Sequence, residues 1–220
     1  MSNIVEQIKS IENQVNGKAK LIAVSKKQPE SKLLEAYNAG FRRFGENYVQ
    51  ELVAKSLNLP KDIEWHMIGH LQTNKVKVIA PFVGLIHSVD SLKLLKEINK
   101  QAIKNKRIID ILLQVHITQE ESKTGLDVKG LYELLNSDLS AFKNIRIIGI
   151  MGMSTFTDDM SIVGAEFSEL STIFLDIKKR FSHLPFTELS MGMSGDWKLA
   201  IEHGSTLIRV GSTIFGNRIQ

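Results

Sequence analysis

The sequence predicts an α/β fold: a (β/α)₈ TIM barrel with one extra helix at its amino terminus. Three observations support this prediction. Short apolar runs alternate with longer amphipathic segments along the whole chain, eight such runs can be recognised, and their spacing is even. An open doubly wound sheet is the competing architecture. The strand count and the even spacing favour the closed barrel, which would be compact at 220 residues.

The expected elements follow one another in regular order. Runs of branched and aromatic residues predict strands at 20–25, 41–44, 63–67, 84–88, 109–116, 145–150, 186–190 and 206–210. Apolar residues at helical spacing predict helices at 30–39, 46–57, 72–80, 91–105, 127–136, 161–181 and 195–203. One more helix precedes the first strand, and a short one is expected after Gly216. No linker rich in proline, glycine or serine divides residues 1–220, so we expect a single domain.

The composition is that of an ordinary soluble globular protein, with 43% hydrophobic and 24% charged residues. No window is long and apolar enough to span a bilayer, and the polar amino terminus does not resemble a secretory signal. The absence of cysteine removes disulfides, thiolate metal sites and cysteine nucleophiles. We therefore expect a cytoplasmic protein that does not bind membranes.

The net charge of +4 is compatible with an anionic ligand. However, the lysines are spread along helical segments, for example at Lys93, Lys96, Lys100 and Lys104, a pattern typical of solvated helix faces. No basic stripe is interleaved with aromatic residues, and no nucleic-acid-binding motif is present. Nucleic acid is therefore not an expected partner.

Polar and glycine residues gather where the predicted strands end, which is where (β/α)₈ barrels carry their chemistry. The loops after the last two strands read "SMGMSGD" and "RVGSTIFG". Ser194, Gly195, Gly211 and Ser212 could cradle a phosphate with backbone N–H groups and hydroxyls. The alternative is that these glycines only make tight turns. Two such loops, adjacent in a barrel, favour the phosphate interpretation.

The first and last strands carry basic residues. Strand alternation gives Lys26 the face of Ile22 and Val24, so Lys26 should reach the barrel mouth while Lys27 leans outward. Arg209 lies among apolar strand residues, where it needs an anion or an acceptor; a structural carboxylate is the alternative. An amine in a cationic, partly desolvated pocket can form an imine with an aldehyde. Lysine, phosphate cradle and arginine together suggest pyridoxal 5′-phosphate (PLP).

Six motifs, from about residue 20 to 218, resemble the pyridoxal phosphate homeostasis protein family: "AVSK", "FGENYVQE", "EWHMIGHLQTNK", "SKTG", "SMGMSGD" and "IRVGSTIFG". The segment "GIMGMSTFTDD" departs from the commoner forms. The resemblance implies a barrel like the N-terminal domain of alanine racemases, which is fold type III of PLP proteins. It also implies that Lys26 carries PLP as a Schiff base, that Ser194, Gly195, Gly211 and Ser212 contact the phosphate, that Asn47 lies near the ring hydroxyl, and that Arg209 faces the pyridine nitrogen.

The resemblance further implies a protein of intracellular PLP homeostasis and amino-acid and keto-acid balance, without established turnover. PLP-dependent apoenzymes would be the recipients, and a monomer is expected. The alternative is an amino-acid racemase or related PLP enzyme. Alanine racemases take a second base, a tyrosine, from another domain, for which no residues remain here after the last strand; only Tyr48 lies near a rim loop. We therefore favour a carrier.

Four further residues are candidate rim contacts. His66 lies near the end of the strand predicted at 63–67, Met151 directly follows the strand predicted at 145–150, and Lys75 and Lys123 lie in predicted rim loops. Each has a structural alternative: a core histidine, an apolar filler, or a solvated lysine. No metal is expected, because His66 and His70 straddle a strand end and a glycine without the helical context of a zinc site.

Overall fold

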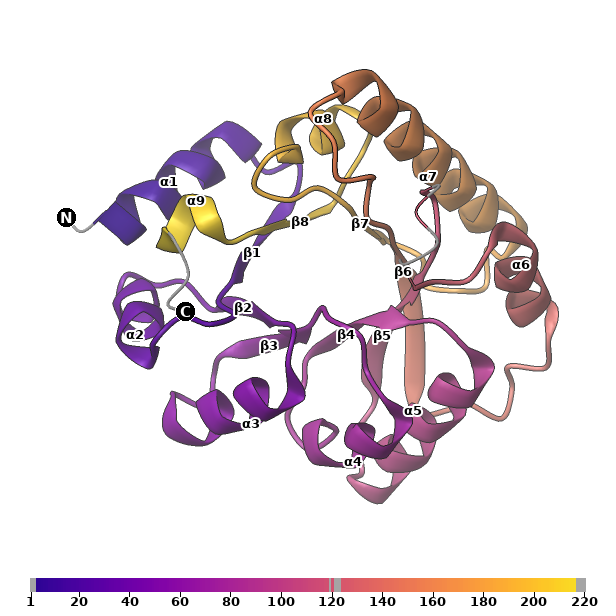
Figure 1. The fold of residues 1–220 in the computed structure, drawn as a ribbon. Helices are drawn as coiled ribbons and strands as arrows, with labels where there is room; N and C mark the ends of the chain where they lie inside the picture. The colour runs from indigo at the N-terminus through magenta and orange to yellow at the C-terminus, as the bar shows by residue number, and fades with distance from the viewer. Residues whose placement is uncertain (1–2, 119, 121–123, 217–220) are drawn as a thin grey trace.

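The computed structural model describes residues 3–118, 120 and 124–216, and their strands close a parallel barrel in sequential order (Figure 1). The strands are β1 (Lys20–Val24), β2 (Arg43–Glu46), β3 (Glu64–Met67), β4 (Leu85–Val89), β5 (Ile109–Gln114), β6 (Ile145–Met151), β7 (Glu188–Ser190) and β8 (Leu207–Val210). Strand β1 pairs in parallel with both β2 and β8, which closes the ring. The predicted barrel is confirmed, and the open sheet is wrong.

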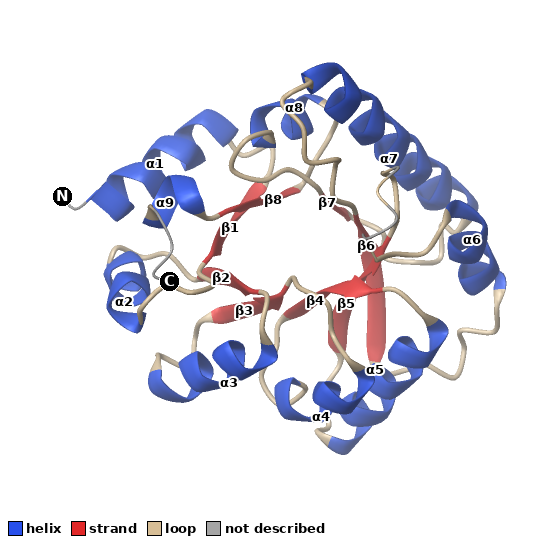
Figure 2. Cartoon of the chain, in the orientation of Figure 1, coloured by secondary structure: helices blue, strands red, loops and turns tan. Residues whose placement is uncertain are grey.

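The helices form an outer ring around the strands (Figure 2). They are α1 (Asn3–Val15), α2 (Glu30–Asn38), α3 (Val49–Asn58), α4 (Val76–Ile79), α5 (Leu92–Lys104), α6 (Val128–Asn136), α7 (Met160–Arg180), α8 (Trp197–Glu202) and α9 (Ser212–Phe215), with a 3₁₀ turn, η1 (Thr73–Lys75). The expected extra helix is α1, whose Ile4, Ile8 and Ile11 form one buried face. It packs against α2 and α9 (Figure 1).

Apolar side chains pack in two regions. The larger region lies between the strands and the helices and includes Phe44, Leu95 and Phe167. The smaller region lies inside the barrel, and its buried members are Ile22, Leu85, Leu112, Met151 and Leu207. The two regions follow from strand alternation, because successive residues of each strand point to opposite faces of the barrel wall.

Strand β2 lies two residues later than predicted. Phe41 packs edge-on against Phe44, with ring centroids 5.5 Å apart, so its hydrophobicity does reflect burial. Its backbone N–H, however, donates to the Ala36 carbonyl in the turn that closes α2, and the strand ladder starts only at Arg43. As a result Glu46 belongs to the strand instead of opening the next helix, and α3 starts at Val49.

Other boundaries also differ from the prediction. The helix expected at 72–80 is divided into η1 and α4, and strand β5 stops at Gln114, with Val115 in an isolated bridge to Leu126. The short final helix expected after Gly216 would fall outside the described residues. The structure instead has α9 before Gly216, which ends that helix with a φ of +74°.

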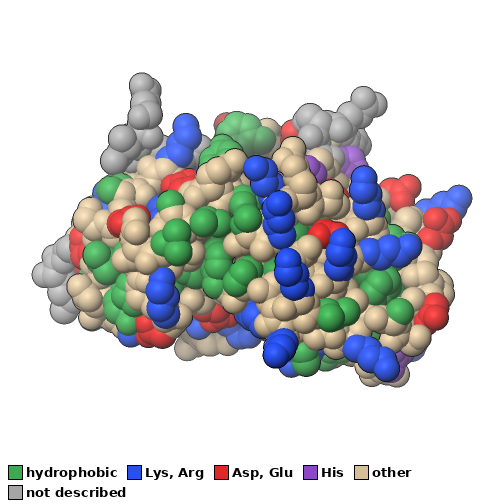
Figure 3. Space-filling model, turned by 90° about the horizontal axis from the view of Figure 1, so that it is seen from below, with side chains coloured by type: hydrophobic (Ala, Val, Ile, Leu, Met, Phe, Trp, Pro, Cys, Tyr) green, Lys and Arg blue, Asp and Glu red, His purple; other side chains and the backbone are tan. Residues whose placement is uncertain are grey.

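The lysines of α5 are exposed, as the sequence pattern indicated: Lys93, Lys96, Lys100 and Lys104 all point to solvent. Figure 3 shows Lys and Arg side chains interspersed with hydrophobic and acidic ones on one side of the barrel, so this face carries no uniform basic surface. Within the described residues, no helix combines the length and the apolar character that crossing a membrane requires.

Gly149 allows a test of how closely strands β6 and β7 must approach each other in the barrel wall. It pairs in register with Glu188 of β7, and a Cβ at this position would lie 1.7 Å from the Glu188 carbonyl oxygen. We expect Gly149→Ala to force the two strands apart and to lower the free energy of unfolding by about 3 kcal/mol. Chemical denaturation measures this. Gly195→Ala is the matched control, because a Cβ there meets no atom within 4 Å; equal losses in both variants would contradict the prediction.

Candidate functional site

A cavity of about 520 Å³ opens at the carboxyl ends of the strands. The end of β1 and the loops after β1, β2, β3, β6, β7 and β8 line it, as expected for a (β/α)₈ barrel. The structure brings to this one cavity all seven residues singled out as cofactor contacts: Lys26, Asn47, Ser194, Gly195, Arg209, Gly211 and Ser212.

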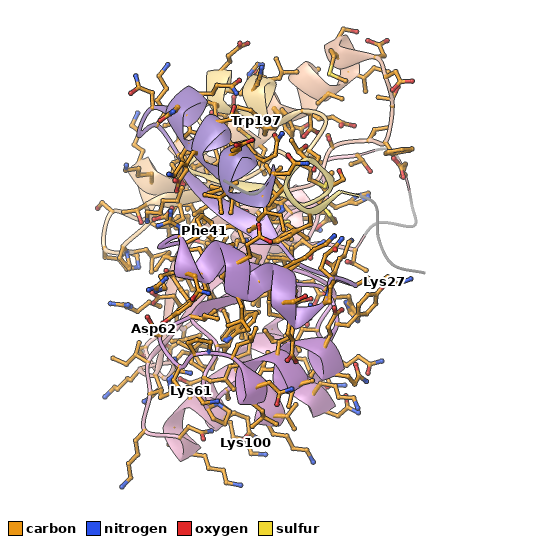
Figure 4. All side chains as sticks on the ribbon, turned by 90° about the vertical axis from the view of Figure 1, so that its left-hand side faces the viewer. Lys27, Phe41, Lys61, Asp62, Lys100 and Trp197 are labelled. Carbon is orange, nitrogen blue, oxygen red and sulfur yellow. The ribbon has the colours of Figure 1, made fainter. Side chains whose placement is uncertain are left out.

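Lys26 and Lys27 diverge as strand alternation indicated. Ile22 belongs to the barrel interior, and Val24 and Lys26 both line the cavity, whereas Lys27 is exposed. Lys27 adopts a positive φ of 56°, which turns the chain away from the strand direction. Figure 4 shows Lys27 at the carboxyl-end face of the barrel, on the opposite side of the molecule from Asp62.

A buried cluster holds the turn that carries Lys26. The Lys55 ammonium donates to three oxygens, Ser25 O, Glu46 Oε1 and Glu51 Oε1, each at 2.7 Å. The Ser25 hydroxyl donates to Glu46 Oε1 at 2.6 Å, and the Lys27 backbone N–H donates to Glu51 Oε1 at 2.6 Å. The residues on either side of Lys26 are therefore anchored to α3 and β2.

Burial raises the pKa of the Glu46 carboxyl to about 7, against the opposing effects of the Lys55 ammonium and the Ser25 hydroxyl. No sequence motif indicates this cluster. Glu51 and Lys55 stand four apart in α3, a spacing common in solvated helices, and nothing in the local pattern shows that Lys55 is buried.

The loops after β7 and β8 are joined at the cavity wall. The Gly211 backbone N–H donates to Ser194 Oγ at 3.1 Å. A Cβ at Gly211 would lie 3.0 Å from the Val24 carbonyl oxygen, so glycine lets the β8 loop approach β1 closely. Asp196 stabilises the β7 loop by accepting from the Met193 N–H at 2.5 Å and from the Ser154 hydroxyl at 2.9 Å.

Arg209 is almost completely buried, yet within the described residues it makes no salt bridge. Nη1 donates to Ser190 Oγ at 2.6 Å and Nη2 to the Gly152 carbonyl at 3.0 Å. Burial lowers its pKa to about 10, and the Asp196 carboxylate counteracts this. The described residues thus contain no carboxylate that pairs with Arg209, which was the structural alternative. Its guanidinium lines the cavity and has further N–H donors to offer a ligand.

Asn47 offers a complementary group. Its side-chain carbonyl oxygen is buried and has no hydrogen-bond partner among the described residues. A buried acceptor of this kind usually meets a donor, and Asn47 lines the cavity. The cavity therefore presents an amine, a cation, an unpaired acceptor and two small-residue loops to one ligand.

Three candidate rim contacts do not reach this cavity. His66 is buried inside the barrel and lines the opening at the amino ends of the strands, because its position in β3 points it inward below the rim. Met151 packs with Ile22 and Leu207 inside the barrel. Lys75 closes η1, which packs against α4 and α5 away from the cavity. Lys123 lies outside the described residues.

The loop after β6 contributes more residues to the cavity than any sequence motif indicated. Residues 153–158 and Met160 line the cavity, and Phe156 is 96% exposed at its mouth. The Glu166 carboxylate holds this loop by accepting from the backbone N–H and the hydroxyl of Thr155. The segment "GIMGMSTFTDD", which departs from the commoner forms, was the sequence feature that set this loop apart. It did not show which side chains face the cavity.

The fold and the site define a class of protein: a (β/α)₈ barrel with a lysine after its first strand, joined small-residue loops after its last two strands, and a buried arginine between them. Consistent with this class, residues 1–218 match the family model described as "Alanine racemase, N-terminal domain". An alanine racemase from Bartonella henselae shares the fold, with a TM-score of 0.73 at 19% identity, over 98% of this chain and 59% of that chain.

The chain is 38% identical over 222 residues to the pyridoxal phosphate homeostasis protein of Aquifex aeolicus, covering 99% of this chain and 96% of the relative. The structure of PipY from Synechococcus elongatus with PLP bound has a TM-score of 0.89 at 38% identity, over 97% of this chain and 100% of that chain. The chain therefore belongs to the pyridoxal phosphate homeostasis protein family, within the broader group of alanine racemase N-terminal domains.

The raised pKa of Glu46 predicts a pH-dependent stability. Its pKa is about 7 in the folded protein against an ordinary value of 4.5, so the folded state binds this proton more tightly. The resulting stabilisation is fully present below pH 4.5 and is lost as the pH rises through 7, by up to about 3 kcal/mol. Glu46→Gln should remove this loss. Chemical denaturation at several pH values measures this. The free energy of unfolding of the variant minus that of the wild type should increase between pH 5 and pH 8. A difference that stays constant with pH would contradict the raised pKa.

Proposed function

We propose that this protein binds PLP in the cavity through a Schiff base with Lys26, and that it stores and passes on the cofactor in PLP homeostasis. The observation that carries the proposal is the convergence of Lys26, the Ser194–Gly211 loop pair and Arg209 on one cavity. The bound PLP in PipY and the names of the curated relatives support it.

The groups present fit the chemistry of PLP. When bound, PLP supplies a reactive aldehyde: the Lys26 nitrogen bonds to the aldehyde carbon, and the carbonyl oxygen leaves as water. Ser194, Gly195, Gly211 and Ser212 would hold the phosphate through hydroxyls and backbone N–H groups. Asn47 would offer its unpaired oxygen to the hydroxyl of the ring.

Arg209 would influence which reactions bound PLP can support. A guanidinium brings its own protons to the pyridine nitrogen and cannot accept one, so that nitrogen would stay unprotonated. Such a ring withdraws electrons less strongly than one paired with a carboxylic acid. Arg209 therefore favours holding PLP over the carbanion chemistry of most PLP enzymes.

The positions of the tyrosines also favour a carrier. Two-base racemisation needs a second proton donor opposite the lysine. None of the tyrosines lines the cavity: Tyr37 donates to Asp62 and Tyr132 to Asp176 at the outer helices, and Tyr48 is a half-exposed residue at the start of α3. The open mouth suits exchange of PLP, and PLP-dependent apoenzymes are the proposed recipients. An amino-acid racemase is the second candidate, favoured only by the shared fold.

The covalent link is tested by substituting the two neighbouring lysines. We expect the wild-type protein with PLP to show a near-visible absorption band and, after borohydride reduction, a pyridoxyl adduct on the peptide that contains Lys26. Lys26→Ala should abolish both signals. Lys27→Ala is the matched control and should retain them, because Lys27 is exposed and turned away from the cavity. An adduct that persists in Lys26→Ala would contradict the proposed role.

Turnover assays separate carrier from enzyme. We expect the PLP-loaded protein to racemise or transaminate amino acids no faster than free PLP at equal concentration, because no tyrosine lines the cavity as a second base opposite Lys26. Chiral chromatography of a panel of amino acids provides the measurement. Stereospecific turnover that disappears in Lys26→Ala would show that the protein is an enzyme and would refute the carrier proposal.

A further inference from the structure

A chain of polar side chains runs through the barrel interior from one mouth to the other. His66 Nε2 lies 3.2 Å from Glu64 Oε1, and His66 Nδ1 lies 2.9 Å from His87 Nε2. His87 Nδ1 lies 3.0 Å from Ser190 Oγ, which accepts from Arg209 Nη1 at 2.6 Å. The chain connects strands β3, β4, β7 and β8 across the barrel.

The two ends of this hydrogen-bond chain, Glu64 and Arg209, lie in different environments. The Glu64 side chain is 51% exposed at the amino-end opening, which Lys20, Asp110 and Arg146 also line. His66, His87 and Ser190 are buried, and Arg209 reaches the cavity at the carboxyl ends. These side chains therefore form a continuous hydrogen-bonded connection between the solvent at one mouth and the cavity at the other.

The donors and acceptors of the chain can be assigned from its two ends. Glu64 is a carboxylate, and its hydrogen bond to His66 holds the pKa of Glu64 below the ordinary value. A carboxylate only accepts, so the proton of His66 must be on Nε2, and Nδ1 of a neutral His66 must accept from His87 Nε2–H. His87 Nδ1 then accepts the Ser190 hydroxyl hydrogen.

This direction leaves every member of the chain satisfied. The Ser190 oxygen donates its hydrogen toward His87 and keeps a lone pair for the Arg209 guanidinium. In the opposite direction His66 Nε2 would be an acceptor facing the Glu64 carboxylate, and Ser190 would face two donors. That arrangement sets two acceptors against each other at a buried position, which is unfavourable.

His87 is best accommodated as a neutral ring. Burial is the main cause that lowers the pKa of His87 well below its usual value, and the neighbouring His66 and Arg209 act in the same direction. A second buried cation close to Arg209 would have no carboxylate of its own at the inner end of the chain. With a neutral His66 as well, the charges of the hydrogen-bond chain would lie at its two ends, on Glu64 and Arg209.

We propose that Glu64, His66, His87 and Ser190 form a one-directional hydrogen-bond chain that positions Arg209, with both histidines neutral and protonated on Nε2. The consequence for the cofactor rests on the proposed function: with Ser190 as its fixed acceptor, Arg209 presents its remaining donors to the ring of PLP. Ser190, His87, His66 and Glu64 are positioning residues, and Glu64 acts from the far mouth of the barrel.

The first experiment determines the tautomers in the PLP-free protein, so its outcome does not depend on PLP binding. Long-range ¹H–¹⁵N correlation spectra of ¹⁵N-histidine protein distinguish the Nδ1–H, Nε2–H and doubly protonated rings. The signals are assigned by replacing, one at a time, the four histidines outside the chain among the six in the sequence. We expect Nε2–H for both His66 and His87 at neutral pH; His87 protonated on Nδ1, or His66 doubly protonated, would overturn the proposal.

The second experiment changes the far end of the chain. In Glu64→Gln the side chain can either accept or donate, so we expect a second, Nδ1–H form of His87 and release of PLP about fivefold faster than from wild type. Asp110→Asn is the matched control: it removes one carboxylate from the same mouth, but Asp110 pairs with Arg146 and, among the described residues, makes no hydrogen bond to Glu64, His66, His87 or Ser190. We expect wild-type tautomers and wild-type release for this variant.

The two experiments separate the proposals. Equal effects of Glu64→Gln and Asp110→Asn would assign any change to the charge of the mouth and would overturn the role of the chain. Nε2–H tautomers without a PLP adduct on Lys26 would refute the proposed function, leaving a chain that positions Arg209 for another ligand. A PLP adduct with the opposite tautomers would refute the chain alone.

Discussion

Pairing of the first strand with the last is the constraint on which the rest of this structure depends. The register sets Ile22 opposite Arg209 and Ala23 opposite Val210. Residues far apart in the chain are thereby brought to one side of the rim, where the turn that carries Lys26 faces the loop that carries Gly211. Parallel closure also directs every strand's carboxyl end to the same mouth, so six loops share one cavity.

The side chains on the two faces of β1 and its continuation have different roles. Its inward face continues from Ile22 through Val24 to Lys26, which lines the cavity. On its outward face Ser25 meets Glu46 and Lys55, a buried cluster that holds the turn from behind. A flexible lysine side chain thus projects from a backbone that both neighbouring residues anchor, which reduces the entropy lost when Lys26 engages a ligand.

Several features could be predicted because local sequence carries them. The alternation of strands and helices, the parity of Lys26 and the small-residue loops near Ser194 and Gly211 all follow from short-range patterns. The start of β2 could not, because Phe41 is buried without joining the ladder. His66 was expected at the wrong mouth, since a strand pattern shows which face a residue takes but not its depth within the barrel.

By itself the sequence determined the fold class, the order of its elements and the residue types that could hold an aldehyde and a phosphate, because periodicity and chain order are local properties. Only the tertiary structure decided which polar and ionisable groups are buried together. Glu46 with Lys55, and His66 with His87, are separated along the chain and meet only when the strands and helices pack. The raised pKa of Glu46, the lowered pKa of His87 and the hydrogen-bond directions depend on burial and partners, which no local pattern specifies.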